Sequence, residues 1–430
     1  MEEEEFGIII SVSGGKIYSI FFKPYYRLGE LYVAEDAEHY YILRCCDTAF
    51  FNIERLQKYD IVYISSREFA DIKKNISFYK FFFGPVLEVV ATLKKEKKKI
   101  EWLEEKLYPR ILLRIYPLSS VKQVKKLVVA EGVQNLPLEV LKQVLSRNII
   151  IVGASGTGKS TLCKQLLQLC EQHCETKTVV FDFHGEYSGK QLPPRIKEEE
   201  ILPEVFEDLF ELGAAQLELL ALGRKLGEEK WLSALRKACY RKTQLVSLFA
   251  EQTVTVVRRR IEQVLSSGIV TEENSCIQEF LAAEEKLLVV PLRDLDLFQS
   301  RLLIYSFIAW VLAHRVPVKI VIDEAHNVLQ KCTLLERLAA EGRKFDLSYL
   351  LITQNPSFFS SRILNNTDTF FILRLPNLKE LQVIISALPR HFEKLELEIK
   401  SFENLRGVMV SSFYPIPVKI NLKQQQPFSR

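Results

Sequence analysis

The stretch Arg147-Asn-Ile-Ile-Ile-Val-Gly-Ala-Ser-Gly-Thr-Gly-Lys-Ser-Thr-Leu162 decides how the chain is interpreted. Its aliphatic segment, residues 149–152, is typical of a strand buried on both faces of a parallel sheet. The glycines that follow allow a tight turn whose backbone N–H groups face phosphate oxygens. A helix starting near Lys159 adds the positive end of its dipole. The spacing Gly153-x-x-x-x-Gly158-Lys159-Ser160 therefore predicts a phosphate-binding loop.

In such a loop the Lys159 ammonium reaches the β- and γ-phosphates, and the Ser160 hydroxyl is a ligand of Mg²⁺. Leucines at helical spacing follow, as the motif requires. A glycine-rich turn without a ligand is the alternative. We expect ATP and Mg²⁺ as cofactors. The expected nucleotide-binding residues are Gly153, Ala154, Ser155, Gly156, Thr157, Gly158, Lys159, Ser160 and Thr161.

Composition is that of an ordinary globular protein. The 430 residues allow two or three domains, with 48% hydrophobic and 26% charged residues. We expect no membrane partner, because we find no apolar stretch that approaches the roughly 18–20 residues needed to cross a bilayer. The acidic start, residues 1–6, is unlike a signal peptide. These features predict a cytoplasmic protein.

Neither the cysteines nor the charge identifies a partner. The eight cysteines include no Cys-x-x-Cys pair. Cys170 and Cys174 flank His173, which could suggest zinc, but no second ligand pair follows at finger spacing. Buried, reduced thiols are the expectation. The net charge of +4 permits nucleic acid as a partner without arguing for it.

The amino-terminal part reads as a β domain. From Phe6 to about Val90, short apolar runs alternate with turn-forming residues, which suggests a small barrel or sandwich. The run Lys94–Lys99 is expected to be a solvated loop or helix face, with phosphate contact as the alternative. A polar, helix-like connection, about 121–143, holds the domain boundary. We expect a barrel over 1–125, an ATPase domain over 126–415 and a tail over 416–430.

A second buried strand, Lys177 to Phe181, leads into a polar cluster, Asp182, His184 and Glu186. Strand ends face the ligand crevice in a doubly wound sheet, so these side chains are candidates for holding Mg²⁺ or the attacking water. A plain strand-to-loop turn is the alternative. Residues from about 190 to 276 are leucine-rich and helical, and they read as an inserted subdomain. Within it, Arg258-Arg-Arg260 is either a contact for DNA or another subunit, or an exposed helix face.

The partner that the phosphate loop needs is Val318-Lys-Ile-Val-Ile-Asp323-Glu324, an aliphatic strand that ends in two acids. Asp323 would hold Mg²⁺, often through water, while Glu324 would polarise the water that attacks the γ-phosphate. Surface charge is the alternative. A further buried strand places Gln354 at its tip. Arg343 and Lys344 end a helix, where dipole complementarity alone would explain them.

Together these motifs resemble one family. The phosphate loop, Asp182-Phe-His-Gly-Glu-Tyr-Ser, Asp323-Glu-Ala-His-Asn, Glu341-Gly-Arg-Lys-Phe and Thr353-Gln-Asn-Pro-Ser357 follow one another as in the HerA-type ATPases. These are ring-forming DNA translocases of the HerA/FtsK group, found chiefly in archaea. The resemblance covers about residues 140–420. It implies a RecA-like P-loop ATPase fold with a mostly parallel sheet and a helical insertion, preceded by a small β-barrel.

The resemblance also implies roles and partners. Lys159, Ser160, Asp323 and Glu324 keep the roles given above, and Gln354 resembles the sensor at its strand tip. Arg343 matches an arginine that acts on the neighbouring subunit's nucleotide, and Arg147 lies where a second such arginine is found. The implied assembly is a homo-hexamer that threads double-stranded DNA, with a NurA-type nuclease as partner in DNA end resection.

We therefore expect an Mg²⁺-ATP-driven DNA translocase or helicase of HerA type. A related DNA-packaging or conjugation motor is one alternative. An ATP-binding scaffold that hydrolyses slowly and organises a nuclease is another, although a pure binder has no need of a base at Glu324.

Overall fold

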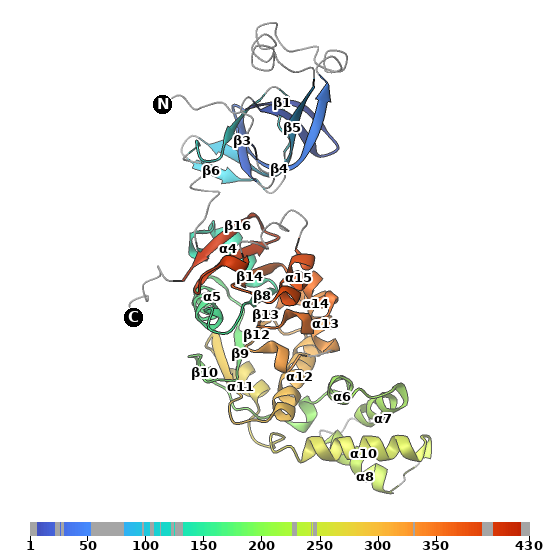
Figure 1. Cartoon of the computed structure of the whole chain (residues 1–430). Helices are drawn as coiled ribbons and strands as arrows, with labels where there is room; N and C mark the ends of the chain where they lie inside the picture. Colours follow the sequence, from blue (N-terminus) through green and yellow to red (C-terminus); the bar gives the residue numbers. More distant parts are fainter. Residues whose placement is uncertain are drawn as a thin grey trace. The chain divides into compact units, whose positions relative to one another are not determined.

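The computed structural model of the chain divides into two compact units, and each is described by itself (Figure 1). Unit 1 comprises residues 1–130 and 389–395, and unit 2 comprises 131–388 and 396–430. The structure describes residues 7–21, 26, 30–52, 81–96, 99–103, 107–111, 113–121, 124, 132–225, 230–241, 243, 247–329, 332–388 and 399–422.

Unit 1 is a closed β-barrel. Its strands are β1 (Gly7–Ser13), β2 (Lys16–Phe21), β3 (Leu31–Glu35), β4 (His39–Asn52), β5 (Phe81–Glu96), β6 (Lys99–Trp102) and β7 (Arg114–Pro117). Six strands follow the order β2-β1-β7-β3-β4-β5, pairing of β2 with β5 closes the ring, and β6 pairs with β5. Alternate side chains such as Ile9, Ile17 and Leu43 fill the interior. The expected small barrel is confirmed.

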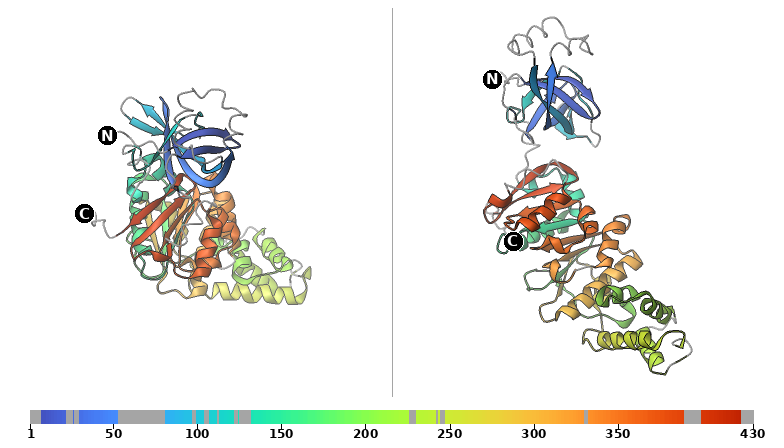
Figure 2. Two further views of the ribbon diagram at one scale, coloured as in Figure 1. Left: turned by 45° about the horizontal axis from the view of Figure 1, so that its top comes forward. Right: turned by 45° about the vertical axis from the view of Figure 1, so that its right-hand side comes forward.

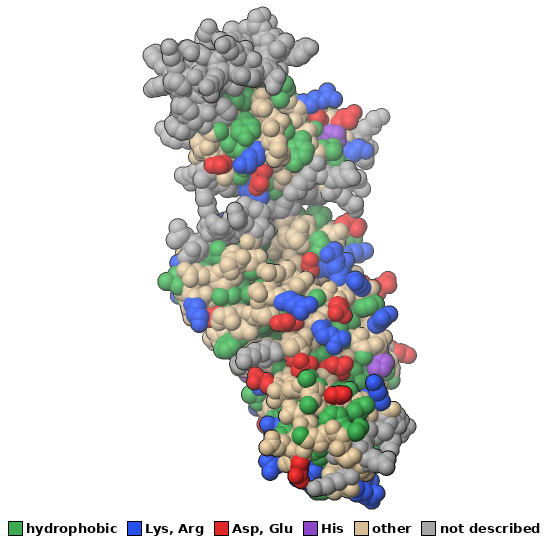
Figure 3. All heavy atoms as spheres, turned by 90° about the vertical axis from the view of Figure 1, so that its right-hand side faces the viewer, with side chains coloured by type: hydrophobic (Ala, Val, Ile, Leu, Met, Phe, Trp, Pro, Cys, Tyr) green, Lys and Arg blue, Asp and Glu red, His purple; other side chains and the backbone are tan. Residues whose placement is uncertain are grey.

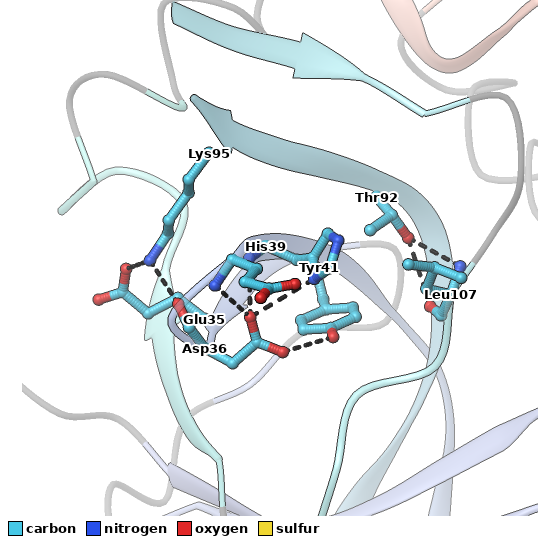
Figure 4. Close-up of polar contacts among 8 residues, drawn as sticks. Glu35, Asp36, His39, Tyr41, Thr92, Lys95 and Leu107 are labelled. Atoms are coloured by element: carbon cyan, nitrogen blue, oxygen red, sulfur yellow. Dashed lines mark hydrogen bonds and ion pairs between the residues drawn. The ribbon is translucent and has the colours of Figure 1, made fainter. Parts of the chain in front are cut away.

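The turn between β3 and β4 is held by the Asp36 carboxylate (Figure 4). Its Oδ1 accepts the backbone N–H groups of Glu38 at 2.8 Å and His39 at 2.7 Å, and its Oδ2 accepts the Tyr41 hydroxyl at 2.7 Å. Burial alone would raise the pKa of Asp36, but these donors outweigh it and lower the pKa. The Asp36 carboxylate therefore stabilises the conformation of this turn.

The run Lys94–Lys99 lies where β5 ends and β6 begins, not on a loop or helix face throughout as expected. Lys95 contacts the same β3–β4 turn: its Nζ lies 2.6 Å from Glu35 Oε2 and 2.7 Å from the Asp36 carbonyl oxygen (Figure 4). Within this run the structure thus assigns Lys95 a role inside the barrel, because a half-buried ion pair already uses its charge. Residues 97 and 98 lie outside the described residues.

Unit 2 is built on a nine-stranded sheet with the order β10-β11-β9-β12-β13-β8-β14-β15-β16. The strands are β8 (Ile149–Val152), β9 (Thr178–Asp182), β10 (Lys190–Gln191), β11 (Leu287–Pro291), β12 (Val318–Ile322), β13 (Leu347–Thr353), β14 (Thr369–Leu373), β15 (Arg406–Ser411) and β16 (Tyr414–Asn421). From β10 to β14 neighbours are parallel, and β15 and β16 are antiparallel. The mostly parallel sheet is confirmed. The expected tail from residue 416 is wrong over 416–421, because β16 pairs there with β15.

Helices cover both faces of this sheet (Figures 1 and 2). They are η1 (Val133–Asn135), α4 (Leu138–Ser146), α5 (Lys159–His173), η2 (Glu198–Glu200), α6 (Pro203–Phe210), α7 (Ala214–Lys225), α8 (Trp231–Arg241), α10 (Glu251–Leu265), α11 (Cys276–Ala282), α12 (Leu297–His314), η3 (Ala325–Asn327), α13 (Thr333–Glu341), η4 (Gly342–Phe345), η5 (Pro356–Phe358), α14 (Ser361–Asn365) and α15 (Leu378–Ala387). The central strands are buried on both faces, which explains their continuous aliphatic runs.

The helical insertion, α6 to α10, has a small core of its own. Trp231 is fully buried, and its Nε1 donates to the Ile201 carbonyl oxygen at 3.1 Å. Two members of the arginine triplet stack on aromatic rings of the same insertion: Arg258 lies 4.7 Å from the Tyr240 ring centre, and Arg260 lies 4.7 Å from that of Phe210. These contacts favour the interpretation of 258–260 as part of a helix face.

One helix, α12, is long and apolar enough to cross a membrane by length and composition, with a mean hydropathy of 1.3 over 18 residues. The expectation that no stretch reaches this length was therefore wrong. Within unit 2, 56% of the helix is buried, and Phe307 makes edge-to-face contacts with Phe181 of β9 and Phe280 of α11. Its apolar character follows from this burial against the sheet.

All eight cysteines are free thiols. Six are buried, as expected, but Cys46 is exposed and Cys174 is half-buried. On the face drawn in Figure 3, basic and acidic side chains of the described residues are interspersed over unit 2. The small net positive charge therefore does not gather on that face.

Candidate active site

The phosphate loop connects β8 to α5 and adopts backbone angles that favour glycine. Gly156 has φ +71° and Gly158 has φ +102°, in the left-handed region that side chains disfavour. A Cβ at Gly158 would also lie 2.8 Å from a methyl group of Leu405. The loop therefore needs glycine here for both its backbone path and its packing. It leaves Ser155 and Gly156 exposed at its tip and turns into α5 at Lys159.

Bonds within the loop and to neighbouring strands fix its shape. The Thr157 hydroxyl donates to the Ala154 carbonyl oxygen at 2.8 Å. From outside, the Ala154 N–H donates to the Arg374 carbonyl oxygen at 2.9 Å, and the Leu405 N–H donates to that of Thr157 at 3.1 Å. The segments after β14 and before β15 thus hold the loop in place, which preorganises it for an anion.

Lys159 lies folded into the loop. Its side chain is 7% exposed, and its Nζ donates to the Ala154 carbonyl oxygen at 3.0 Å. Burial lowers the pKa of Lys159, while the negative charges of Glu324 and Asp323 oppose that shift. The two acids therefore lie close enough to act on this ammonium. Next to it, Ser160 is partly exposed and Thr161 is exposed on the first turn of α5.

Asp323 follows β12 at the same edge of the sheet and is 3% exposed. Its Oδ1 accepts the Glu324 N–H at 2.8 Å, and its Oδ2 accepts the Tyr187 hydroxyl at 2.8 Å. Burial raises the pKa of the Asp323 carboxyl, and these two donors oppose the rise. Tyr187 was missed by the sequence analysis, because a tyrosine 136 residues away carries no local signal that it bonds Asp323.

Asp182 holds the turn that presents Tyr187. Its carboxylate accepts three backbone N–H groups, those of His184 at 3.0 Å, Gly185 at 2.9 Å and Tyr187 at 2.9 Å. His184 and Glu186 are exposed on this turn. These three hydrogen bonds favour the plain-turn alternative for Asp182, and a part in holding Mg²⁺ or the attacking water stays a prediction.

Glu324 adopts a left-handed backbone conformation, with φ +46°. Its Oε1 accepts the Gln354 side-chain amide at 3.1 Å, so the expected sensor and base are in direct contact. Its Oε2 is buried and, among the described residues, has no hydrogen-bond partner, although His326 Nδ1 lies 3.4 Å away. A buried carboxylate oxygen with a spare acceptor site is what a general base needs.

His326 lies between the base and the β13 tip. Besides facing Glu324, its Nδ1 is 3.4 Å from the Thr353 hydroxyl, and its ring stacks on Phe358 of η5. Burial lowers the pKa of His326. The sequence analysis did not single out this histidine, although its position two residues after Glu324 was a signal that could have done so.

Arg147 and Arg343 are not brought to this edge. Arg147 precedes β8 and Arg343 lies on η4, which precedes β13, so both lie at the amino edge of parallel strands. The four residues of β8 alone span about 13 Å between the two edges. Neither arginine can therefore reach the phosphate loop of its own chain.

The amino edge has its own polar network. Lys319, a buried lysine on β12, donates to the Arg147 carbonyl oxygen at 2.8 Å. Asp368, just before β14, lies close enough to Arg343, Arg147 and Lys319 for their charges to lower its pKa, although burial raises it more. This edge thus combines fixed cations with one carboxyl.

The residues present fit Mg²⁺. A hydroxyl from Ser160 and a carboxylate from Asp323 are hard oxygen donors, and each Asp323 oxygen keeps a lone pair beyond its one hydrogen bond. Among the described residues, no cluster of three or more His, Cys, Asp or Glu side chains forms a separate metal site. An ion at this edge would be held mainly by one hydroxyl, one acid and phosphate, as is usual for Mg²⁺.

The mostly parallel sheet and the phosphate loop together define the P-loop ATPase fold. The family model described as "Helicase HerA, central domain" matches residues 126–310, and the resemblance to HerA-type ATPases is thereby confirmed. The DNA double-strand break repair helicase HerA of Sulfurisphaera tokodaii is 21% identical, with 65% of each chain covered. That of Pyrococcus furiosus is 21% identical, with 66% of each covered. The chain thus spans about two thirds of the length of these curated relatives.

Among solved structures, the plasmid coupling protein TrwB in complex with a non-hydrolysable GTP analogue has a similar fold. It is 16% identical, with a TM-score of 0.52, and the match covers 70% of this chain and 90% of that chain. At this identity the likeness concerns the fold, which agrees with the nine-stranded sheet and the phosphate loop.

Proposed function

We propose that this chain is an Mg²⁺-ATP-driven motor of HerA type that moves along double-stranded DNA. The observation that carries the proposal is the buried Glu324 Oε2, which has a spare acceptor site beside the phosphate loop. A scaffold that only binds ATP gains nothing from an acid with one buried oxygen that is held in a left-handed backbone conformation. An enzyme that activates water does.

The residues divide the work of hydrolysis. The loop N–H groups and Lys159 bind the phosphates, with Lys159 exchanging its bond to the Ala154 carbonyl oxygen for phosphate oxygens. Ser160 and Asp323 hold Mg²⁺, which neutralises charge on the phosphates when bound. Glu324 accepts a proton from the attacking water at Oε2, while Gln354 holds Oε1 and fixes the orientation of the carboxylate.

The placement of the two arginines supports a ring. Charge develops on the transferred phosphoryl group, and a guanidinium stabilises it strongly. Because Arg343 and Arg147 lie at the far edge of their own sheet, the nucleotide they serve belongs to a neighbouring copy. A homo-hexamer with shared sites is the assembly we propose, acting in the cytoplasm.

DNA as the substrate, a role in end resection and repair, and a NurA-type nuclease as partner are parts of the same proposal. Their support is that the matched relatives are named DNA double-strand break repair helicases. The second candidate is a related motor that packages DNA or acts in conjugation. The fold shared with the coupling protein TrwB favours keeping it. Strand separation or duplex movement, measured on linear DNA with and without a nuclease of NurA type, distinguishes the two.

The test of the proposal is ATP turnover by Glu324→Gln, with and without duplex DNA. We expect the variant to bind ATP while turnover falls by at least about 100-fold, as loss of a positioned base typically does. Glu171→Gln, which neutralises an exposed acid on α5, is the matched control and should turn over normally. Turnover retained by Glu324→Gln would refute the assignment. Turnover by the wild type that duplex DNA does not stimulate would favour the slow scaffold.

A further inference from the structure

Helix α13, which leads directly to Arg343, is capped by a side chain from the helical insertion. Among the described residues, Cys332 at its N-cap gives the helix no side-chain hydrogen bond. Instead Asp208 of α6 accepts the Thr333 N–H at 2.9 Å with Oδ1 and the Leu334 N–H at 2.9 Å with Oδ2. These are two of the N–H groups that the start of any helix leaves without a partner.

The same carboxylate takes two further donors. The Thr333 hydroxyl donates to Oδ1 at 2.7 Å, and the Cys332 thiol donates to Oδ2 at 3.3 Å. Both carboxylate oxygens are therefore used twice, and the negative charge lies at the positive end of the α13 dipole. Thr333 and Asp208 are 125 residues apart, so this cap is a tertiary contact between insertion and ATPase core.

The far end of α13 is tied to Arg343 without a flexible link. The helix ends at Glu341, and η4 begins at Gly342. A Cβ at Gly342 would lie 2.8 Å from the Leu347 carbonyl oxygen, so this turn packs tightly against the start of β13. On the buried side, Leu335 and Leu338 anchor the helix in the core. A displacement of the α13 N-terminus is therefore carried along a rod of about 13 Å to the arginine.

The other end of the contact is equally firm. Asp208 lies within α6, whose Phe206 is fully buried against Trp231 in the core of the insertion. Phe210, on the same helix, packs against Phe298 of α12. The carboxylate is thus presented by a helix that is fixed to both the insertion and the sheet domain.

We propose that Asp208 is a positioning residue for Arg343. Through Asp208, the helical insertion fixes the orientation of this arginine toward the nucleotide of the neighbouring subunit. The inference rests on the proposed function, because it needs a shared site. It assigns the insertion a task in hydrolysis. Asp208 itself touches neither nucleotide nor water in this scheme.

The test is Asp208→Asn, which keeps the side-chain shape but removes the charge and half of the acceptor capacity. We expect kcat for ATP to fall by about 10- to 100-fold through misplacement of Arg343, with little change in KM. Glu207→Gln, an exposed acid one residue earlier on α6, is the matched control and should keep wild-type kcat. Wild-type kcat in Asp208→Asn would overturn the proposal.

Mixing separates positioning from simple destabilisation. Asp208→Asn subunits keep an intact phosphate loop, and Lys159→Ala subunits keep a well-placed Arg343, so mixtures should have higher activity than either homogeneous protein. A partly unfolded Asp208→Asn would not be rescued in this way, and absence of rescue overturns the inference. Absence of rescue for Arg343→Ala with Lys159→Ala as well overturns the proposed function itself.

A double variant provides the second measurement. If Asp208 acts through Arg343, adding Asp208→Asn to Arg343→Ala should lower the remaining kcat by less than 2-fold, because the residue it positions is already gone. A loss that multiplies fully with that of Arg343→Ala would show that Asp208 acts elsewhere, since independent sites are additive in free energy.

Discussion

The carboxyl and amino edges of the nine-stranded sheet present different groups of side chains. At the carboxyl edge Asp323 and Glu324 lie close enough to the phosphate loop for their charges to act on Lys159, and Glu324 bonds both Asp323 and Gln354. At the amino edge Arg147 and Arg343 lie beside Lys319 and Asp368, at the opposite ends of the strands from the phosphate loop. Under the proposed function, the carboxyl edge binds ATP and activates water, and the amino edge supplies cations that stabilise charge on a nucleotide. A single copy would then carry both sets of groups, and a neighbouring copy would bring them together.

The largest expected effect distinguishes the two edges by whether a substitution abolishes ATP binding or only ATP turnover. Lys159→Ala at the carboxyl edge should lose both ATP binding and turnover. Arg343→Ala at the amino edge should keep ATP binding, while turnover falls by about 10³-fold or more, as for an arginine supplied across an interface. Nucleotide binding by fluorescence and steady-state turnover measure the two effects. Loss of binding in Arg343→Ala would contradict the separation of the edges.

A smaller effect is expected within the carboxyl edge. Tyr187→Phe removes the hydroxyl that donates to Asp323 Oδ2 at 2.8 Å, so Asp323 is less well oriented. We expect the Mg²⁺ concentration for half-maximal turnover to rise by about 10- to 100-fold, as for other partners of metal ligands. Tyr349→Phe is the control, because its buried hydroxyl bonds Ile363 instead. An unchanged Mg²⁺ requirement in Tyr187→Phe would remove Asp323 from the metal site.

Stability is expected to depend on the turn beneath Tyr187. Asp182→Asn leaves one carbonyl oxygen where two carboxylate oxygens accepted three N–H groups. The free energy of unfolding should fall by about 1–3 kcal/mol, because a buried donor then lacks its partner. Urea denaturation measures this change. A loss of turnover larger than the loss of stability explains would instead return Asp182 to the catalytic set.

The smallest effect tests the lowered pKa of Cys174, which directly follows α5 at the amino edge. A hydrogen bond from Cys170 lowers the pKa of Cys174 to about 7, against burial, and the charges of Lys319, Lys286 and Lys142 contribute. The pKa of Cys46, in the barrel, is raised by partial burial of its thiol and by the negative charge of Glu88. Iodoacetamide should therefore modify Cys174 faster than Cys46 at pH 7, with half its limiting rate near that pH. Mass spectrometry measures the modification of each cysteine. Faster modification of Cys46 than of Cys174 would contradict the lowered pKa of Cys174.

Structural features that depend on a few contiguous residues could be predicted from the sequence. The phosphate loop needs glycines at set spacing, and Asp323-Glu324 follows directly on an aliphatic strand, so backbone geometry alone places both at strand ends. The aliphatic runs likewise indicated strands that are buried on both faces of a parallel sheet. Local chemistry determines these elements, because glycine angles and strand burial leave marks within a few residues.

Features that join distant residues could not be predicted. Tyr187 bonds Asp323 across 136 positions, and Asp208 caps α13 across 125. Nothing in the neighbouring sequence distinguishes Tyr187 or Asp208 from a tyrosine or an aspartate that makes no such bond. The apolar α12 was underestimated because polar residues interrupt its run, although the fold buries most of the helix. Burial and partners of this kind depend on the tertiary fold, which no local pattern encodes.

We propose that a second copy of the chain completes each site. ATP turnover of Arg343→Ala and Lys159→Ala subunits, each inactive alone and mixed in varying ratio, tests this directly. We expect activity to appear on mixing and to be highest at intermediate ratios, where an intact phosphate loop meets an intact arginine. Mixtures as inactive as the separate variants at every ratio would contradict it.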